Sequence, residues 1–549
     1  MLKPLKIFLL LLLCFISVSS KSQTWKWFDH GNMRNPYGGT YTIRTDSLAN
    51  IYIMGSSNDS ISMFGISHYA SNYESFLFKL DSSGALIWYK FFHSSNNVLL
   101  YDLEVTADGT CYLSGNFGGS LQIDSESLVC QGQDPLLIKI SPSGVCAWMK
   151  EYHGSQNGTG FANDLVLDEN ERIYLCGWST VNPVSSGTWI YDAAFVTCVD
   201  SSGTALWFNQ YDMTLPSGSW CGGCFTFYSI ALDNNKNVYV SGSMSFNDST
   251  AYAVLEGDTL SHQESLVSSY DQNGNHRFTN HNNTGYAFTN SIAPLPNGNI
   301  VSSTAYYDSI FVNGAWYYSQ MTCNNILQFM DTTGAVYGVY NISGNGTQRV
   351  SKMTADTSGN IIISAYYDDT LICNGLQVPP VDSGYDILLF SLNPATNQVN
   401  WYYSFGGKDR DMLSDVYTDD DNHLFICGST ISDTCDFNTT AVVKQGALAL
   451  FWGEMEMPLS TTSLDVLTND KDVVVYPNPS FGSFYVGSNR KDIDALQIEI
   501  YTLQGVKIKE GRLHAGEQKS MVINTPGTYL VRCMIDGNTA VIKKLVIIN

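Results

Sequence analysis

One loop combines cysteine chemistry with a cluster of aromatic residues. Cys221 and Cys224 flank two glycines within residues 215–228, LPSGSWCGGCFTFY. A lone CxxC lacks the second pair that a zinc site needs, so we expect a local disulfide that stiffens the loop. Redox chemistry is the less favoured alternative. The loop also predicts a stacking platform for a sugar or peptide, with packing on a neighbouring loop as the alternative. The platform residues are Trp220, Phe225, Phe227 and Tyr228.

Histidines and acidic turns are the candidates for metal chemistry. His30, His93 and His153 occupy one repeated position, but other repeats place other residue types there, so we expect hydrogen-bonded loop histidines. Turns such as residues 168–171 carry Asp and Asn, which are typical both of hairpin turns and of calcium loops. None matches the twelve-residue calcium loop. We therefore expect hairpin turns with calcium as the alternative, and we assign no metal ligand and no cofactor.

Catalytic motifs are absent from the sequence. It contains no nucleophile elbow, zinc-protease HExxH, phosphate-binding loop or dinucleotide fingerprint. Paired carboxylates for cleaving glycosidic bonds are defined by three-dimensional spacing, and nothing singles out a pair among 51 acidic residues. The sequence therefore assigns no catalytic residue and favours a non-enzymatic role, while an enzyme stays open.

Charge and the N-terminal segment indicate an exported protein. The net charge of −23 argues against nucleic acid or anionic lipid as a partner. Within residues 1–20, Lys3 and Lys6 precede a short apolar run and small residues, which predicts a signal peptide. No other stretch has transmembrane length, so we expect no transmembrane segment. Most other cysteines, such as Cys176 and Cys427, stand where other repeats have Ser or Met, which predicts small buried residues.

A repeated phrase supplies the elements that must position these residues. An acidic turn followed by a strand, as in LDENERIYLCG, recurs about every 62 residues, and such a period fixes the architecture. Each of the first six copies is followed by a second hairpin with a DSSG-like turn and a strand that starts near Trp, or near Phe278 and Tyr337 in the fourth and fifth copies. Two hairpins give four antiparallel strands, the blade of a β-propeller. The seven phrases end at Gly55, Gly115, Gly177, Gly242, Thr304, Ala365 and Gly428.

The two ends of the repeat region complement each other. Residues 25–30, WKWFDH, resemble the end of a repeat with nothing before it, whereas the seventh repeat stops after residue 451 without its last strand. We therefore predict that the N-terminal strand completes the last sheet and closes a seven-bladed propeller over residues 23–455, which removes exposed strand edges. A binding site is expected on the face that carries the connections between the two hairpins and between blades.

The last part of the chain differs from the repeats in composition and in strand pattern. Residues 456–471 are polar and carry no repeat phrase, which predicts a linker. Residues 472–549 contain short alternating strands separated by Gly and Asn turns, which predicts a small immunoglobulin-like β-sandwich.

The C-terminal segment carries a set of motif residues in a characteristic order: Tyr476, Pro477, Asn478, Pro479, Gly505, Gly527, Tyr529, Lys543 and Lys544. Through these residues the segment closely resembles the sorting domain of type IX secretion cargo in Bacteroidota. The resemblance implies export through the N-terminal signal, passage across the outer membrane by the type IX machinery, and removal of the domain with release or surface attachment of the cargo. The repeats are similar to a bacterial β-propeller repeat family, which brings no activity with it.

Together these patterns predict an all-β protein that is secreted or held at the cell surface. The leading expectation for its function is adhesion to, or capture of, an extracellular glycan or protein. The alternatives are a polysaccharide hydrolase or lyase with acidic residues in the propeller channel, and a structural surface component. The sequence does not identify the ligand, the oligomeric state or the cleavage site of the sorting domain.

Overall fold

The chain is all-β. In a computed structural model it forms two compact units, one of Gln23–Met457 and one that includes Pro458–Asn549. The residues that the structure describes contain strands and no helix. The predicted signal peptide and nearly all of the predicted linker lie outside them. The described residues are 25–152, 159–180, 192–211, 213–214, 224–245, 252–261, 263–319, 322–373, 376–437, 440–457, 473–488, 495–502, 507–514, 517–535 and 539–548.

Each repeat forms four antiparallel strands joined by the turns that the sequence predicts. In repeat 3 the Asp168 carboxylate accepts hydrogen bonds from the backbone N–H groups of Asn170 and Arg172, each 2.9 Å long, and so closes the turn after the first strand. The strands are, for repeat 1, β2 (Gly38–Thr45), β3 (Ile51–Ser57), β6 (Glu74–Leu80) and β7 (Leu86–Phe92); for repeat 2, β8 (Val98–Val105), β9 (Cys111–Ile123), β10 (Glu126–Ile140) and β11 (Cys146–Glu151); for repeat 3, β12 (Gly160–Leu167), β13 (Ile173–Thr180), β14 (Asp192–Val199) and β15 (Ala205–Tyr211); for repeat 4, β17 (Cys224–Leu232), β18 (Val238–Ser245), β21 (Gln263–Tyr270) and the first part of β22 (His276–Pro294); for repeat 5, the rest of β22, β23 (Ile300–Val312), β25 (Asn324–Met330) and β26 (Val336–Gly344); for repeat 6, β27 (Gln348–Ala355), β28 (Ile361–Tyr367), β31 (Asp386–Asn393) and β32 (Gln398–Phe405); for repeat 7, β33 (Asp411–Thr418), β34 (Leu424–Thr430), β37 (Leu448–Met455) and β1 (Trp25–Met33).

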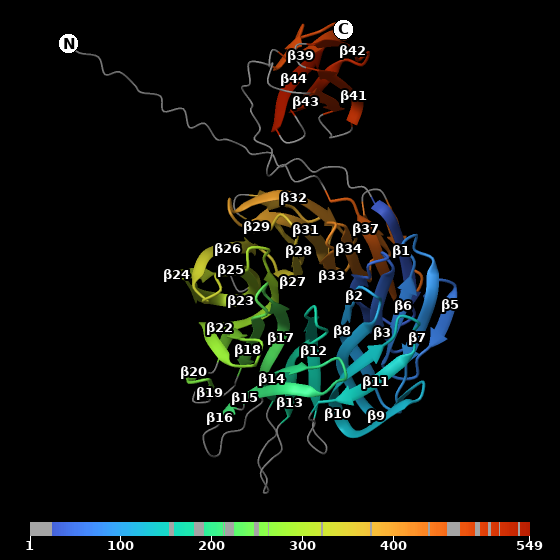
Figure 1. Ribbon diagram of the computed structural model, residues 1–549, viewed down its shortest axis with the longest axis vertical. Coiled ribbons are helices and arrows are strands. Elements are labelled where there is room, and N and C mark those ends of the chain that lie inside the picture. Colours follow the sequence, from blue (N-terminus) through green and yellow to red (C-terminus); the bar gives the residue numbers. More distant parts are fainter. Residues whose placement is uncertain are drawn as a thin grey trace, which may run out of the picture. The chain divides into compact units, whose positions relative to one another are not determined.

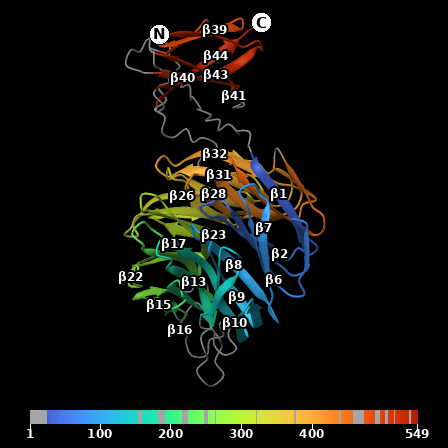
Figure 2. The same ribbon diagram turned by 45° about the vertical axis from the view of Figure 1, so that its right-hand side comes forward.

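The repeats follow one another around a common centre, and their first strands lie nearest to it (Figures 1 and 2). First strands of neighbouring repeats contact each other, including β33 of repeat 7 and β2 of repeat 1. Small strands, most of them in hairpins between the second and third strands of a repeat, complete this unit. They are β4 (Ser60–Met63), β5 (Ile66–Tyr69), β16 (Met213–Thr214), β19 (Tyr252–Leu255), β20 (Asp258–Leu260), β24 (Ala315–Tyr318), β29 (Leu371–Cys373), β30 (Leu376–Val378), β35 (Thr434–Asp436) and β36 (Ala441–Val443).

The N-terminal strand pairs with the last repeat, as predicted. β1 runs antiparallel to β37, with Trp27 opposite Glu454 and Met33 opposite Leu448. The Lys26 Nζ atom lies 2.5 Å from Glu454 Oε1, and the Trp27 indole N–H donates a 3.0 Å bond to Glu454 Oε2. The first strand of the repeat region therefore supplies the fourth strand of its final sheet.

The Trp and Gly of the second hairpin connect neighbouring repeats. The Trp148 indole N–H donates a 3.2 Å bond to the Ser201 carbonyl in the turn of repeat 3. A Cβ atom on Gly203, in the same turn, would lie 3.2 Å from the Trp148 ring, so the glycine makes room for it. Repeat 4 carries Phe278 in place of Trp, and there Arg277 donates a 2.7 Å bond to the next turn. The Gly of the DSSG-like turn and the Trp of the following strand thus encode packing between repeats as well as the turn itself.

A pair of glycine variants separates this packing from backbone strain. Gly274 and Gly84 occupy the same turn position with φ of +82° and +86°, but an added Cβ would lie 2.6 Å from Trp207 at Gly274 and would meet nothing within 4 Å at Gly84. We expect Gly84→Ala to lower the free energy of unfolding by about 1 kcal/mol and Gly274→Ala by about 2–4 kcal/mol. Urea denaturation of the mature chain measures both, and equal losses would contradict the packing role.

The C-terminal unit has two antiparallel sheets that share one core. The Tyr529 hydroxyl donates a 2.7 Å bond to the Thr525 carbonyl, the backbone contact typical of a tyrosine corner. Asn478 Oδ1 accepts a 2.9 Å bond from the Val546 N–H, which holds the YPNP segment against the last strand. The sheets are β38 (Val473–Tyr476), β39 (Ser483–Ser488) and β42 (Gln518–Val522), and β41 (Lys507–His514), β40 (Ala495–Thr502), β43 (Gly527–Ile535) and β44 (Thr539–Ile547).

The structure places the sorting-motif residues at two sites in this unit. The YPNP residues are exposed: Tyr476 is the last residue of β38, and the other three follow it. Gly527 and Tyr529 lie in β43, and Lys543 and Lys544 lie in β44. Gly505 lies outside the described residues.

Candidate functional site

The predicted aromatic platform is wrong for two of its members. Phe225 and Phe227 are fully buried, because they lie on the first strand of repeat 4 and pack into a core that includes Tyr211. Tyr228 is 38% exposed, and its hydroxyl accepts a 3.5 Å bond from Ser243. Trp220, Cys221 and the side chain of Cys224 lie outside the described residues, so the loop disulfide stays a prediction.

The structure places several of the other cysteines and histidines that the sequence singles out. Cys176 and Cys427 are buried and free, as expected for small residues in a sheet. His93 Nδ1 lies 2.7 Å from Glu74 Oε1, which confirms a hydrogen-bonded loop histidine at that position. His30 instead lies exposed in strand β1, and His153 lies outside the described residues. Among the residues that are placed, no group of three or more His, Cys, Asp or Glu is arranged to hold a metal ion. Calcium binding stays untested.

A β-bulge in the first strand of every repeat sets which side chains point toward the centre. At the bulge one extra residue interrupts the pairing, and the alternation of side chains restarts after it. The residue after the bulge precedes each turn by the same spacing, as Asp164 precedes Asp168. This spacing can be read directly from the sequence. The residues after the bulge are Thr42, Asp102, Asp164, Ser229, Ser291, Lys352 and Asp415.

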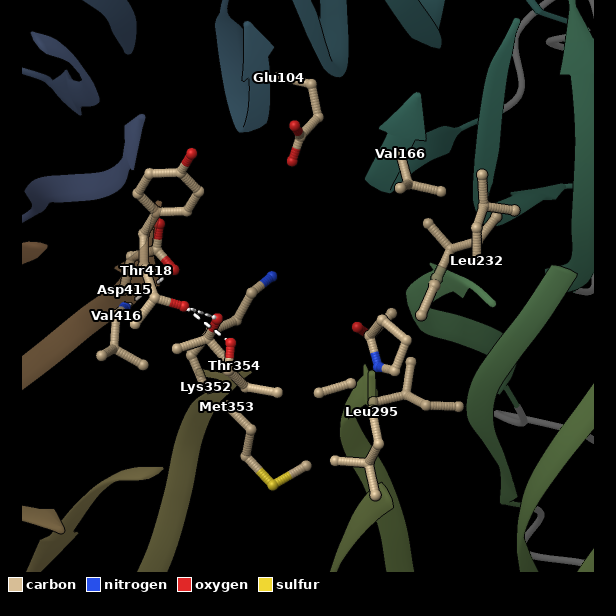
Figure 3. Close-up of a pocket in the computed structure, with 18 of the residues that line it drawn as sticks. Glu104, Val166, Leu232, Leu295, Lys352, Met353, Thr354, Asp415, Val416 and Thr418 are labelled. Carbon is tan, nitrogen blue, oxygen red and sulfur yellow. Dashed lines mark hydrogen bonds between the residues drawn. The ribbon is translucent and has the colours of Figure 1, made fainter. Parts of the chain in front are cut away.

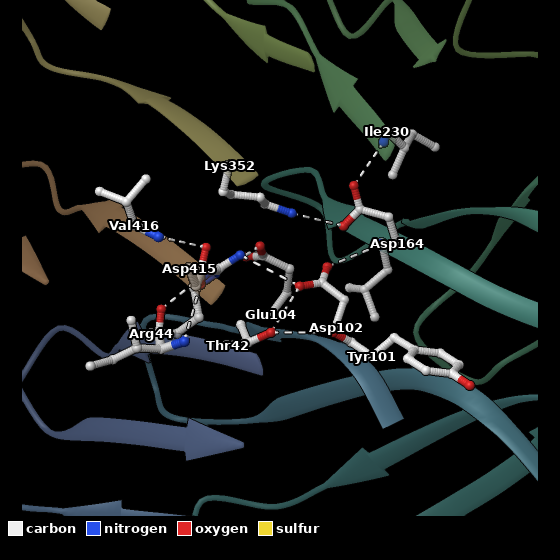
Figure 4. A network of polar contacts seen from close by, with 12 residues as sticks. Thr42, Arg44, Tyr101, Asp102, Glu104, Asp164, Ile230, Lys352, Asp415 and Val416 are labelled. Atoms are coloured by element: carbon white, nitrogen blue, oxygen red, sulfur yellow. Dashed lines mark hydrogen bonds and ion pairs between the residues drawn. The ribbon is translucent and has the colours of Figure 1, made fainter. Parts of the chain in front are cut away.

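Three of these residues are aspartates that hold the next repeat in place. Each carboxylate accepts a hydrogen bond from a backbone N–H in the first strand of the following repeat (Figure 4). Such bonds satisfy backbone groups that the bulge leaves out of the sheet. The bonds run from Leu165 to Asp102 at 3.1 Å, from Ile230 to Asp164 at 2.9 Å and from Ile43 to Asp415 at 3.1 Å.

Two cations lie among these carboxylates. Arg44 Nη1 is 2.6 Å from Asp415 Oδ2, and its Nε atom is 3.0 Å from Glu104 Oε1. Lys352 Nζ is 3.5 Å from Asp164 Oδ1. The side chains of Arg44 and Asp415 are only 9% and 2% exposed, whereas those of Lys352 and Glu104 are 27% and 24% exposed. The network thus has a buried part that connects repeats and a part that solvent and a ligand can reach.

Asp102 and Asp164 have pKa values that are shifted in opposite directions. Burial, followed by the charge of Asp164, raises the pKa of Asp102 well above its ordinary value. Burial also acts to raise the pKa of Asp164, but the Lys352 charge and hydrogen bonds from Asp102 and Ile230 hold it below its ordinary value. The negative charge of the pair is therefore favoured on Asp164, beside the ammonium group of Lys352.

A cavity of 520 Å³ lies beside this network. We call it the axial funnel, because the first strands of the repeats line it. Figure 3 shows the Lys352 ammonium and the Glu104 carboxylate pointing into it, and these two groups form its charged floor. One wall is apolar; on the other side the hydroxyl groups of Thr354 and Thr418 form a 3.0 Å hydrogen bond. The apolar wall includes Val166, Leu232, Leu295 and Met353.

The axial funnel opens on the face opposite to the one expected for a binding site. Asn234, Pro296, Asp356 and Asp420 line its mouth, and all four belong to turns between first and second strands. The connections between hairpins and between repeats lie at the other ends of these strands. The expectation of a site among those connections does not apply to this cavity, because the charged residues after the bulge lie toward the short turns.

This arrangement suits binding better than acid–base cleavage of a sugar polymer. Glycosidic cleavage requires two carboxyl groups on opposite sides of the scissile bond, separated by about 5–9.5 Å. Asp102 and Asp164 instead contact each other, each accepts a backbone hydrogen bond, and their side chains are 4% and 6% exposed. The cavity is lined by the ammonium group of Lys352, the carboxylate of Glu104 and the apolar wall, which together can orient a polar molecule.

Comparison with known families identifies the C-terminal unit. Residues 474–548 match the family model described as the secretion system C-terminal sorting domain. The match confirms the predicted sorting domain, and this domain supports a chain that is type IX secretion cargo exported to the cell surface or beyond. No helix in the described part of the chain is long and apolar enough to span a membrane. No curated protein matches the chain.

Solved structures show only distant likeness. An ulvan lyase of polysaccharide lyase family PL25 is 10% identical, with coverage of 80% of this chain and 90% of that chain and a TM-score of 0.31. A puromycin hydrolase is 9% identical, with coverage of 72% and 59% and a TM-score of 0.30. Dimeric latent PorU from Porphyromonas gingivalis is 12% identical, with coverage of 74% and 36% and a TM-score of 0.13. Likeness at this level assigns no activity.

Proposed function

We propose that this chain is a secreted or cell-surface binding protein that captures an extracellular glycan or protein in the axial funnel of a seven-bladed β-propeller. The observation that carries the proposal is the 520 Å³ cavity with a charged floor, formed by Lys352 and Glu104, and an apolar wall. Concave sites with an apolar lining and a few convergent polar groups are typical of ligand binding.

Contacts between the ends of the repeat region support the propeller. Besides the pairing of β1 with β37, the Thr40 hydroxyl of repeat 1 donates a 2.8 Å bond to the Gly428 carbonyl of repeat 7. The bond from Ile43 to Asp415 joins the same two repeats. Side chains of both repeats, among them Ile43 and Phe425, pack in one buried cluster. A closed ring would leave no unpaired strand edge between the first repeat and the last.

The secretion route belongs to the same proposal. Residues 1–20 act as a signal peptide, and the machinery recognises the C-terminal sorting domain, as in Bacteroidota. Removal of that domain then leaves the propeller at the surface or in the medium, where adhesion is its role. A polysaccharide-degrading activity and a purely structural role are the competing proposals.

Occlusion of the funnel mouth tests the binding role. Asp420 is exposed at the mouth, whereas its exposed neighbour Asp421 is in the same turn but does not line the cavity. On an array of extracellular glycans and matrix proteins, we expect Asp420→Trp to weaken at least one interaction of the mature chain by about tenfold or more and Asp421→Trp to leave the same interaction unchanged. Both variants lose one charge, so the pair controls for electrostatics. Absence of any interaction, or equal effects of the two variants, would overturn the proposal.

A further inference from the structure

A second surface feature, an aromatic hairpin in repeat 5, differs from the axial funnel in chemistry and lies on another face of the repeat region. The hairpin formed by the end of β23 and by β24 in repeat 5 exposes three large aromatic side chains: Phe311 is 43%, Trp316 54% and Tyr318 70% exposed. The hairpin lies between the second and third strands of its repeat, on the face opposite to the funnel mouth. Exposed apolar surface of this kind marks interaction sites.

The strand register brings the three rings into one strip. Phe311 pairs directly with Trp316, and Tyr318 lies two residues further along the same face. The ring centroids of Phe311 and Trp316 are 5.3 Å apart, and those of Trp316 and Tyr318 are 6.3 Å apart with planes only 23° from parallel. An Asn313-Gly314 turn with positive φ at both residues fixes the hairpin. The strip is therefore built on a rigid element.

The fold does not require these aromatic residues. The other face of the hairpin carries the buried Ile310 and Val312, which anchor it to the repeat. In the equivalent hairpins, the pair that corresponds to Phe311 and Trp316 consists of smaller or more polar residues. These pairs are Ser62 with Ser67, Gln122 with Ser127, Val254 with Thr259, and Ile372 with Gln377. Hairpins of the same design thus form without an aromatic strip. Formation of the fold therefore does not account for the exposed rings of repeat 5.

We propose that Phe311, Trp316 and Tyr318 form a stacking surface for an uncharged, pyranose-based polysaccharide. The C–H groups on one face of a pyranose ring carry a partial positive charge, which the negative face of an aromatic ring attracts. None of the strip residues is charged, so the strip offers no ion pair to an acidic or basic partner. The net charge of −23 further disfavours a sulfated or uronic polymer. An uncharged polyhydroxylated chain is the partner whose charge matches the strip.

Affinity electrophoresis of the mature chain tests this assignment. The gels contain a soluble β-1,4-glucan, a β-1,3-glucan, a xylan or a mannan, with alginate as an anionic polymer. We expect at least one neutral polymer to retard the chain, Trp316→Ser to weaken that interaction by about tenfold or more, and alginate to have no effect. Tyr69→Ser is the matched control, because Tyr69 occupies the position of Tyr318 in the hairpin of repeat 1 and is 68% exposed.

Other occupants of the strip give different results. If the strip joined two copies of the chain, sedimentation would show a dimer that Trp316→Ser dissociates, and if it bound a protein, no neutral polymer would retard the chain. Either result overturns the proposal, as does equal retardation of Trp316→Ser and the unaltered chain. Asp420→Trp, which occludes the funnel mouth, should leave the retardation unchanged, so this site and the funnel are tested separately.

Discussion

Replacement of Arg44 by methionine is expected to lower the free energy of unfolding by about 3–5 kcal/mol. The guanidinium group is buried and lies against the carboxylates of Asp415 and Glu104. Methionine keeps much of the apolar stem but leaves these carboxylates without a counter-charge in a site with little water. Because Asp415 also accepts the Ile43 N–H, the loss acts on the contact between repeats 7 and 1.

Urea denaturation of the mature chain, followed by tryptophan fluorescence, measures this loss. A double variant, Arg44→Met with Asp415→Asn, should regain a large part of it, because asparagine removes the unpaired charge and still accepts the backbone hydrogen bond. Lys90→Met is the control: its partner Asp124 is 37% exposed and 3.0 Å away, so we expect a change below about 1 kcal/mol. Similar losses for Arg44→Met and Lys90→Met would contradict the role assigned to the buried network.

Removal of residues 23–33 is expected to have the larger effect. The shortened chain lacks β1, so β37 presents an unpaired edge between repeats 7 and 1, and Glu454 loses its bonds to Lys26 and Trp27. Phe28 also leaves a cluster of rings that includes Phe437 and Phe451. We expect the shortened chain to associate through the free edge and to unfold at lower urea in a broader transition.

Light scattering after size-exclusion chromatography, together with urea denaturation, measures both effects. A synthetic peptide of residues 23–35 should bind the shortened chain and restore the monomer, because the edge of β37 with which it pairs is intact. A peptide of the same composition in scrambled order is the control. A monomeric shortened chain with an unchanged unfolding transition would show that the first strand does not hold the ends of the repeat region together.

Several features of the fold could be predicted from neighbouring residues alone. Asp168 closes its turn through groups two and four residues away, so the acidic turn is readable wherever the phrase occurs. The missing strand in repeat 7 and the surplus strand at the N-terminus are visible from the repeat period, and β1 indeed pairs with β37. The sorting domain is recognised for the same reason, since its motif residues keep their order and spacing over one short segment.

The candidate sites depended on contacts that the order of residues does not reveal. Phe225 and Phe227 look like loop residues beside a CGGC motif, yet the first strand of repeat 4 begins at Cys224 and buries both rings. Asp102 and Lys352 are unremarkable in sequence until a bulge in each strand turns them toward the same axis. The exposure of Trp316 likewise follows from which face of its hairpin packs on the repeat.

The sequence by itself determined the all-β class, the repeat, the pairing of its two ends and the export domain, because turns and strand alternation are set by residues close together in the chain. The tertiary structure alone decided where charge and aromatic surface gather. Arg44, Glu104 and Asp415 come from repeats 1, 2 and 7, and they meet because a bulge resets the side-chain alternation in each first strand. Side chains so far apart in the chain become neighbours only once the repeats pack around a common centre.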